Sequence, residues 1–238
     1  MTQAPARNDV RAPRTTIHDV VDRALLAETE LFRGLDPGDL DRIADAGETR
    51  SFSRGDVIFT EGDDPTELFV VASGRIAIAN RSVDGRESVV ALMETGDLFG
   101  EMPLFDGLAR SAEARALEPS EVIAIPYEPL RALYEAQPEL LWNVVALLAG
   151  RLRSTDEALA DSVFLDVTGR TAKRLLELAG DAEEFSLPVT QEELAGMVGA
   201  SRERVNKAIA SFVRLGWIEQ ADRRYRITDR EQLSRRAR

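Results

Sequence analysis

The stretch TQEELAGMVGASRERVNKAIASFVRLGW, from Thr190 to Trp217, decides the fold of the C-terminal part of the chain. It begins with a threonine that has a glutamate three positions later, a capping box that predicts a helix starting after Thr190. Gly199 predicts the end of that helix, Ser201 caps a second helix, and Gly216 stops the second one. Two helices joined by so short a turn, the second of them longer, are typical of a helix–turn–helix motif.

The second helix of this motif opens with charged side chains. A recognition helix reads base edges with its N-terminal turns, where arginine suits guanine and glutamate accepts a hydrogen bond from cytosine. Arg202, Glu203 and, about one turn later, Lys207 fit that chemistry, and the arginines of the following hairpin suit phosphate contacts. A helix–turn–helix can also be scaffolding, but the basic excess on helix and hairpin favours DNA. The candidate DNA-contacting residues are Thr190, Ser201, Arg202, Glu203, Lys207, Arg223 and Arg224, with Arg226 beside them.

The charge of the chain is unevenly distributed. The whole chain carries 30 − 42 = −12, whereas residues 169–238 carry 14 − 11 = +3 and residues 1–168 carry 16 − 31 = −15. Only the C-terminal part therefore tolerates a polyanion such as double-stranded DNA. An acidic surface that merely aids solubility would give the same asymmetry, so the charge alone leaves both interpretations open.

Composition excludes several classes of function. With no cysteine and a single histidine, His18, the chain offers no disulfide, iron–sulfur cluster or cysteine-ligated zinc, and little scope for Ser-His-Asp catalysis. It has no Gly-rich phosphate loop, carboxylate-rich metal motif or activated nucleophile, so we expect neither an enzyme nor a metal site nor a cofactor. The start lacks the apolar run of a signal peptide, and the apolar stretch Leu140–Ala149 is too short to span a bilayer. We therefore expect a cytoplasmic protein that does not contact membranes.

Four segments are expected along the chain. They are a disordered tail over residues 1–16, a strand-rich domain over 17–136, a long helix and hinge over 137–168, and a smaller α/β unit over 169–238. The strand-rich domain begins with two short helices, the second capped by Asp36, and continues with short apolar runs between turn residues. Asp84-Gly85 is a strong hairpin signal, and short strands at this spacing predict an all-β sandwich or barrel.

Mostly apolar residues of the long helix recur at alternating steps of four and three. The positions are Leu141, Val145, Leu148, Leu152, Thr155, Leu159 and Ser162. This heptad seam, with charged residues away from it, favours a two-stranded coiled coil between two copies of the chain and hence a homodimer. A core helix packed on its own barrel is the alternative. Thr155 and Ser162 weaken burial locally, so these polar residues require another role.

Three motifs stand at characteristic places in this order of segments. They are Phe99-Gly100-Glu101-Met102 with Arg110-Ser111-Ala112, Asp166-Val167-Thr168-Gly169-Arg170 with Ala172 and Leu175-Leu176, and Val198-Gly199-Ala200-Ser201-Arg202-Glu203-Arg204-Val205. Together they resemble the CRP/FNR superfamily of bacterial transcription regulators, in particular the cyclic-AMP receptor protein branch, over residues 25–238. The resemblance implies an α+β fold, in which a β jelly-roll cyclic-nucleotide-binding domain is followed by a long dimerisation helix and a C-terminal winged helix–turn–helix.

The resemblance also implies a ligand pocket. A buried cyclic phosphate needs a fixed cation and hydrogen-bond donors, which Arg110, Ser111 and backbone amides can supply. Glu101 would accept a hydrogen bond from the ribose 2′-hydroxyl, and Gly100 allows close backbone approach. A pairing of Arg110 with Glu113 on a loop is the alternative. The implied ligand-binding residues are Gly100, Glu101, Met102, Arg110, Ser111, Ala112, Thr155 and Asp156.

The identity of the base is less constrained than the cyclic phosphate. Family members contact adenine from the dimerisation helix, at the positions matched here by Thr155 and Asp156. Thr155 keeps the family's usual hydroxyl, whereas Asp156 replaces a neutral serine or asparagine. A carboxylate can accept from the adenine amino group or face the N1–H and N2–H₂ of guanine. The resemblance makes cyclic AMP the expected ligand, with cyclic GMP, cyclic di-GMP or no ligand as alternatives.

The expected function is that of a homodimeric regulator that reads a palindromic, TGTGA-like site when the ligand re-aims its recognition helices through the hinge. Lys207 replaces the family's usual arginine and lacks its bidentate fork, which weakens discrimination there. A cyclic-nucleotide sensor acting on a partner protein is another class, against which the complete helix–turn–helix argues. Contact with RNA polymerase is left open, because the connector Gly180–Thr190 is shorter than the loop that makes it in better-known relatives.

Overall fold

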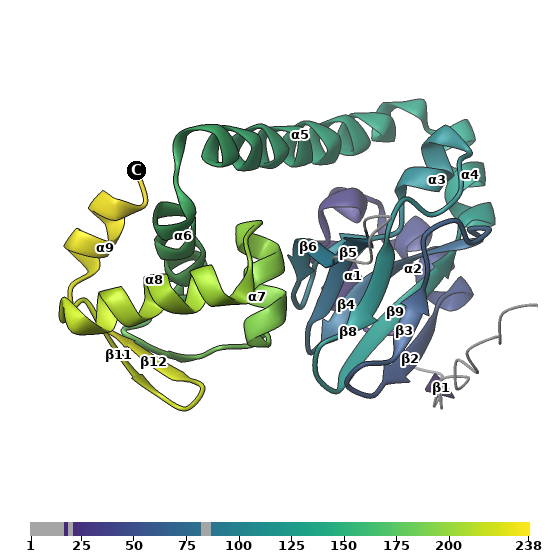
Figure 1. Cartoon of the computed structure of the whole chain (residues 1–238). Helices are drawn as coiled ribbons and strands as arrows, with labels where there is room; N and C mark the ends of the chain where they lie inside the picture. Colours follow the sequence, from purple (N-terminus) through teal and green to yellow (C-terminus); the bar gives the residue numbers. More distant parts are fainter. Residues whose placement is uncertain (1–16, 19–20, 82–86) are drawn as a thin grey trace, which may run out of the picture.

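The computed structural model describes residues 17–18, 21–81 and 87–238. Figure 1 shows a strand-rich N-terminal unit, a long helix, and a helical C-terminal unit with a small sheet. The predicted disordered tail over residues 1–16 and the predicted turn at Asp84-Gly85 lie outside the described residues. Of the helices in the described ranges, none combines enough length with enough apolar character to span a bilayer.

The N-terminal unit is a sandwich of two antiparallel sheets with four short α-helices. Its elements are β1 (Ile17–His18), α1 (Arg23–Glu28), the 3-10 helix η1 (Glu30–Phe32), α2 (Pro37–Ala46), β2 (Glu48–Phe52), β3 (Val57–Phe59), β4 (Glu67–Ser73), β5 (Ile76–Arg81), β6 (Glu87–Met93), β7 (Leu98–Phe99), α3 (Met102–Asp106), β8 (Glu113–Ala116), β9 (Ser120–Pro126) and α4 (Tyr127–Ala136). One sheet has the strand order β1-β2-β9-β4-β7 and the other β3-β8-β5-β6. The prediction of a β sandwich is confirmed.

Strand β4 of the first sheet is buried on both faces, and its successive residues point to opposite sides. In β4, Phe69 and Val71 enter the core between the two sheets. Leu68 and Val70 pack on the other side, in a core that they share with α1, α2, α4 and the long helix. This double burial explains why the strand reads as an unbroken apolar run rather than as an alternation.

The predicted helix cap at Asp36 is present. Its carboxylate accepts a hydrogen bond from the Asp39 amide at 2.9 Å, and Pro37 is the first residue of α2. The first of the two expected helices is interrupted, because Thr29 ends α1 and the chain continues as η1.

The rest of the chain forms the long helix and the C-terminal unit. The elements are the 3-10 helix η2 (Pro138–Leu140), α5 (Leu141–Phe164), α6 (Val167–Ala179), β10 (Glu184–Ser186), α7 (Gln191–Val198), α8 (Arg202–Arg214), β11 (Ile218–Ala221), β12 (Arg224–Ile227) and α9 (Arg230–Arg236). β10, β12 and β11 form a small antiparallel sheet. Sequence analysis did not identify α3, α4, β10 or α9, and it placed residues 167 and 168, the first two of α6, in the hinge.

The predicted helix–turn–helix corresponds to α7 and α8. The Thr190 hydroxyl accepts the Glu193 amide at 3.1 Å, and Glu193 Oε2 accepts the Thr190 amide at 2.6 Å, which completes the capping box. Gly199 takes a left-handed conformation at φ +66°, and Ser201 caps α8. α6 begins earlier than expected because Asp166 accepts the Gly169 amide at 2.8 Å and thereby starts a helix at Val167.

The C-terminal unit packs against the outer face of β5 and β6, where Figure 1 also shows α7. Ala77, Ala79 and Val89 of this face belong to the same apolar core as α6, α7 and α8. At the edge of the contact, the Ser88 hydroxyl donates to the Gly196 carbonyl at 3.3 Å. Arg115 of the sandwich pairs with Glu193 at 3.5 Å, so the glutamate of the α7 capping box also contacts the sandwich.

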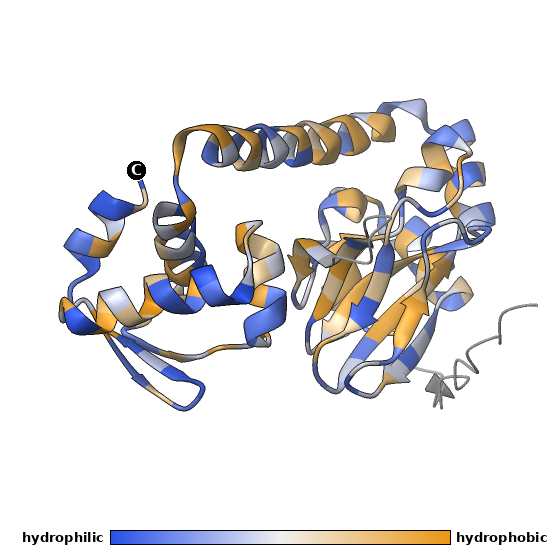
Figure 2. Ribbon diagram, viewed as in Figure 1, coloured by the Kyte–Doolittle hydropathy of each residue, from blue (hydrophilic) through white to orange (hydrophobic). Residues whose placement is uncertain are grey.

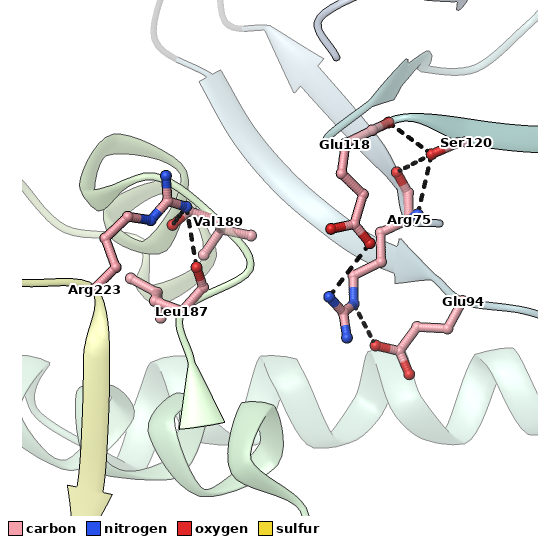
Figure 3. A network of polar contacts seen from close by, with 7 residues as sticks. All are labelled: Arg75, Glu94, Glu118, Ser120, Leu187, Val189 and Arg223. Atoms are coloured by element: carbon pink, nitrogen blue, oxygen red, sulfur yellow. Dashed lines mark hydrogen bonds and ion pairs between the residues drawn. The ribbon is translucent and has the colours of Figure 1, made fainter. Parts of the chain in front are cut away.

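Gly74 provides a test of the sandwich. Its φ is +82°, and a Cβ there would lie 2.3 Å from Ser120 Oγ, which bonds Arg75 and Glu118 (Figure 3). We expect Gly74→Ala to cost about 1–2 kcal/mol for the left-handed backbone and a further ~1–3 kcal/mol for overpacking. Gly55→Ala is the matched control, because Gly55 has φ +88° with open space around the Cβ position. Equal losses of unfolding free energy in urea for the two variants would refute the packing argument.

Candidate functional site

A cavity of about 1030 Å³ opens between the sandwich, α5 and the start of the C-terminal unit. Seven of the eight predicted ligand residues line it, namely Gly100, Glu101, Met102, Arg110, Ser111, Ala112 and Thr155. Asp156 is not among the lining residues, because it follows Thr155 on α5 and so points about 100° further round the helix. A role for Asp156 in this cavity is therefore not supported within one chain.

Arg110 lines the cavity and is buried, with 5% of its surface exposed. Its guanidinium donates to the Gly100 carbonyl at 2.7 Å, to the Glu67 carbonyl at 2.7 Å and to the Tyr127 hydroxyl at 3.1 Å. It also lies over the Phe59 ring, 4.2 Å from the centroid. These contacts fix the orientation of the guanidinium.

All of these partners are neutral groups. Burial raises the pKa of Tyr127 to about 12, so its hydroxyl stays protonated. Within the described ranges no carboxylate forms an ion pair with Arg110, and the alternative partner, Glu113, instead pairs with Arg115 at 3.3 Å. The nearby Glu101 carboxylate acts on Arg110 electrostatically but forms no ion pair with it. A buried cation without a directly paired carboxylate is costly, so this site favours an anion.

Gly100 brings the loop close to this cation. Its φ is +76°, and a Cβ there would lie 2.6 Å from Arg110 Nη1. Any other residue would therefore displace the guanidinium and strain the backbone.

Further donors face the same cavity from Ser111 and Ala112. The only described partner of the Ser111 hydroxyl is the Met102 sulfur, at 4.0 Å. In the turns and loops that the structure describes, neither the Ser111 nor the Ala112 amide donates a backbone hydrogen bond. Two amides and a hydroxyl next to a guanidinium are the donor set that a phosphate group requires.

Glu101 is fully buried and is held from α5. One carboxylate oxygen, Oε1, pairs with the Arg151 guanidinium, which also donates to the Leu98 carbonyl at 2.5 Å. The other oxygen, Oε2, is buried and has no partner among the described residues. Burial raises the pKa of Glu101, and the charge of Arg151 opposes that rise. The free oxygen can accept a hydrogen bond from a ligand hydroxyl.

Sequence analysis missed Arg151, Tyr127 and Phe59 as parts of this site. Arg151 was placed among the charged residues away from the helix seam, although it stands four residues before Thr155 and therefore on the same helical face. The Thr155 hydroxyl donates to the Arg151 carbonyl at 2.9 Å. Tyr127 and Phe59 approach Arg110 only through the folding of the sheets, so no local pattern indicates them.

The N-terminal turns of α8 form an exposed polar surface. Its buried side consists of Val205, Ala208, Ile209 and Phe212 at helical spacing. Arg202, Glu203 and Lys207 are exposed, and the described residues include no ion-pair partner for them. Their charges are thus available to another molecule.

The other predicted DNA-contacting residues differ in whether their side chains already make hydrogen bonds within the protein. Thr190 and Ser201 use their hydroxyls as helix caps. Arg223 donates to the Leu187 carbonyl at 3.0 Å and to the Val189 carbonyl at 3.2 Å (Figure 3), so it holds the connector before α7. Arg224 is exposed on β12.

Further basic residues line a groove of about 440 Å³ between the start of α6 and α8. Arg204, Lys207 and Arg214 contribute to it. Arg204 and Arg214 were not among the predicted site residues. The described residues contain no cluster of side chains able to hold a metal ion.

Comparisons with known proteins identify two domains in this chain. Family models match residues 49–137 as a cyclic nucleotide-binding domain and residues 169–236 as a Crp-like helix-turn-helix domain. A CRP-like cAMP-activated global transcriptional regulator of Mycobacterium tuberculosis is 38% identical over 221 residues, covering 90% of this chain and 99% of that protein. A cyclic AMP receptor protein of Thermus thermophilus is 36% identical over 186 residues, covering 78% and 86%.

A solved structure is similar over most of its length. The c-di-GMP-responsive global regulator CLP of Xanthomonas campestris matches with a TM-score of 0.71 at 27% identity, covering 81% of this chain and 99% of that one. Glu101, Arg110 and the helix–turn–helix lie within the two segments that the family models match, whereas the α5 residues that line the cavity lie between those segments. The chain therefore belongs to the CRP/FNR superfamily of transcription regulators, with a cyclic nucleotide-binding domain and a DNA-binding helix–turn–helix domain.

Proposed function

We propose that this protein is a cyclic-AMP-responsive homodimer that binds a palindromic, TGTGA-like DNA site. One observation carries the ligand part of the proposal: the buried guanidinium of Arg110 has only neutral described partners. Ser111 and Ala112, whose amides donate no described backbone hydrogen bond, also line this cavity, as does Glu101 with its unpartnered Oε2. A cyclic phosphate fused to a ribose presents an anion and a 2′-hydroxyl close together, which this arrangement matches.

In this proposal the phosphate lies against Arg110 and Ser111, and the ribose hydroxyl donates to Glu101 Oε2. The base then reaches α5, where Thr155 lines the cavity. Adenine is supported by relatives described as cAMP-activated or as cyclic AMP receptor proteins. Any contribution from Asp156 requires the second chain of a dimer.

Dimerisation is supported by the exposed side of α5. Val144 and Leu147 face the sandwich core, so one side of the helix is already covered. Leu152 and Leu159 on the heptad seam are 62% and 63% exposed, and Figure 2 shows apolar residues continuing along this helix. An apolar stripe at heptad spacing is stabilised by a second such helix.

DNA recognition is supported by the free charges at the start of α8. Arg202 and Glu203 would meet base edges, with Lys207 one turn later. Two recognition helices of a dimer must lie about one DNA turn apart, ~34 Å, to read both half-sites. The proposal includes no contact with RNA polymerase, because the connector before α7 is held in the C-terminal sheet as β10.

Coupling between ligand and DNA would pass through α5. A ligand that bonds Glu101 Oε2 adds a hydrogen bond to the carboxylate that Arg151 holds through Oε1, and Arg151 belongs to the helix whose C-terminal end leads into the C-terminal unit. A ligand shifts such an equilibrium only by its differential affinity for the two states, typically about 1–3 kcal/mol.

A second candidate keeps the fold and changes the ligand. The cavity continues beyond Arg110 as far as Lys173 and Gly196, and the similar regulator CLP is described as responsive to c-di-GMP. Calorimetric titration with cyclic AMP, cyclic GMP and cyclic di-GMP separates these ligands. Heat from cyclic di-GMP alone would replace cyclic AMP in the proposal.

Arg110→Ala tests the phosphate contact. Removing charge-assisted hydrogen bonds of about 1.5–3 kcal/mol should weaken cyclic-AMP binding at least ~10-fold in titration calorimetry. Arg110→Lys, which keeps the charge, should retain part of the affinity. Arg54→Ala is the control, since Arg54 is an exposed arginine without a described side-chain partner. Unchanged affinity in a folded Arg110→Ala protein would remove Arg110 from the pocket.

Arg202→Ala tests base recognition. We expect a loss of ~1–3 kcal/mol on the preferred site and relaxed choice at one base pair, measured by binding to a set of single-base variants. Arg214→Ala, at the other end of α8, should leave the base preference unchanged. If Arg202→Ala weakens all sequences equally, the residue is only a phosphate contact.

Leu159→Asp tests the dimer seam. A carboxylate on the seam has to be buried without a partner, so we expect the variant to sediment as a monomer in analytical ultracentrifugation. Ala146→Asp places the same residue on an exposed position of α5 away from the seam and should stay dimeric. A dimeric Leu159→Asp protein would place the interface elsewhere.

A further inference from the structure

The hinge between α5 and the C-terminal unit consists of two residues. α5 ends at Phe164 and α6 begins at Val167, which leaves Leu165 and Asp166, both with extended backbones. All relative movement of the two elements must therefore be absorbed at or beside these positions.

Arg170 binds the first hinge residue. Its guanidinium donates to the Leu165 carbonyl at 2.7 Å and to the Val198 carbonyl at 2.7 Å. Val198 is the last residue of α7, so this arginine connects the hinge with the turn of the helix–turn–helix.

Arg236 binds the second hinge residue from the C-terminal end of the chain. Its Nη2 atom lies 2.5 Å from both Asp166 Oδ1 and Asp166 Oδ2. The same carboxylate caps α6 through the Gly169 amide. The hydrogen bond from the Gly169 amide, and after it the hydrogen bond from Arg236, hold the pKa of Asp166 below its usual range. The carboxylate is therefore charged at neutral pH.

α9 is built to place Arg236 there. Leu233 is completely buried in the core of the C-terminal unit, and at the start of α9 Arg230 donates to the Ala182 carbonyl at 2.8 Å. Because Ala182 follows α6 and Asp166 precedes it, α9 runs antiparallel along α6, as Figure 1 also shows. At Gly169 a Cβ would lie 3.0 Å from the Arg236 carbonyl oxygen, so a glycine permits this close approach.

The ion pair is too exposed to act mainly through stability. The side chains of Asp166 and Arg236 are 64% and 32% exposed, and pairs of this kind contribute little to folding. The effect of the ion pair is on geometry: the Arg236 guanidinium fixes the position of the Asp166 carboxylate, which caps α6.

We propose that Arg236 is a positioning residue: through Asp166, the C-terminal helix α9 holds the two-residue hinge in a defined conformation and so fixes the orientation of the recognition helix relative to α5. Its regulatory consequence rests on the proposed function, because an ordered hinge is what lets a ligand at one end of α5 select one orientation of α8.

The orientation can be measured without ligand or DNA. The chain has no native cysteine, so Glu157→Cys on α5 and Gln220→Cys on β11 accept one spin label each. Labelled chains are diluted with unlabelled ones, and the distance distribution is measured by pulsed electron paramagnetic resonance. Arg236→Gln should broaden or shift the distribution, and Arg236→Lys should restore much of it.

Two further variants make the test specific. Arg235→Gln removes the same charge from the neighbouring residue, which pairs with Glu231 within α9, and should leave the distribution unchanged. Asp166→Asn keeps a good helix cap while removing the carboxylate charge, so it should match Arg236→Gln. The double variant should add nothing to either single variant. An unchanged distribution for Arg236→Gln, or an additive double variant, would overturn the inference.

The regulatory consequence has its own readout. The ratio of DNA affinities with and without cyclic AMP should change about 2- to 30-fold in Arg236→Gln and stay constant in Arg235→Gln. An unchanged ratio beside an altered distance distribution would overturn the regulatory part. If cyclic AMP fails to bind the parent protein, the proposed function fails, while the distance measurement still decides the role of Arg236.

Discussion

The buried charge of Arg110, which has no ion-pair partner among the described residues, is the constraint on which the pocket depends. The guanidinium keeps its place because two carbonyls, a hydroxyl and an aromatic ring from separate strands and loops surround it. Those contacts stabilise its position but leave its charge unneutralised by any described carboxylate. Gly100 has to be a glycine for the same reason, since the loop passes within van der Waals distance of the cation. An anionic ligand therefore supplies the ion-pair partner that Arg110 lacks in the described part of the chain. The free energy of its binding is then available to favour one conformation of the protein.

In the proposed mechanism α5 transmits that change, because the helix takes part in three environments. Val144 and Leu147 belong to the sandwich core, Arg151 holds the buried Glu101, and Leu152 and Leu159 present an apolar seam to solvent. At its C-terminal end the helix meets a hinge of two residues, each held by a different arginine. The C-terminal unit also contacts the outer face of β5 and β6, so its orientation reflects a balance between that contact and the hinge.

Much of the local structure could be predicted, because its determinants are close in sequence. The capping box at Thr190, the cap at Asp36 and the ends of α7 and α8 depend on residues at most a few positions apart. α9 was not predicted because Leu233 is its single buried residue. The rest of its sequence is polar or charged and resembles a charged tail. Arg151 escaped because its partner Glu101 is 50 residues away, and Arg223 was assigned to phosphate contacts although it has carbonyl partners in the preceding connector.

The sequence by itself determined the order of the segments, the helix starts and stops, and the set of motifs that includes Arg110, Glu101 and the opening of α8. The order of the segments and the helix starts and stops follow from periodicity and capping, which act over a few residues, whereas Arg110 and Glu101 were indicated by the resemblance to the CRP/FNR superfamily. Only the tertiary structure decided which groups meet: that Glu101 is shared with α5, that Asp156 faces away from the cavity of its own chain, and that Asp166 pairs with Arg236. Such contacts join positions 50 to 70 residues apart, and burial and charge pairing at that separation depend on how the sheets and helices pack.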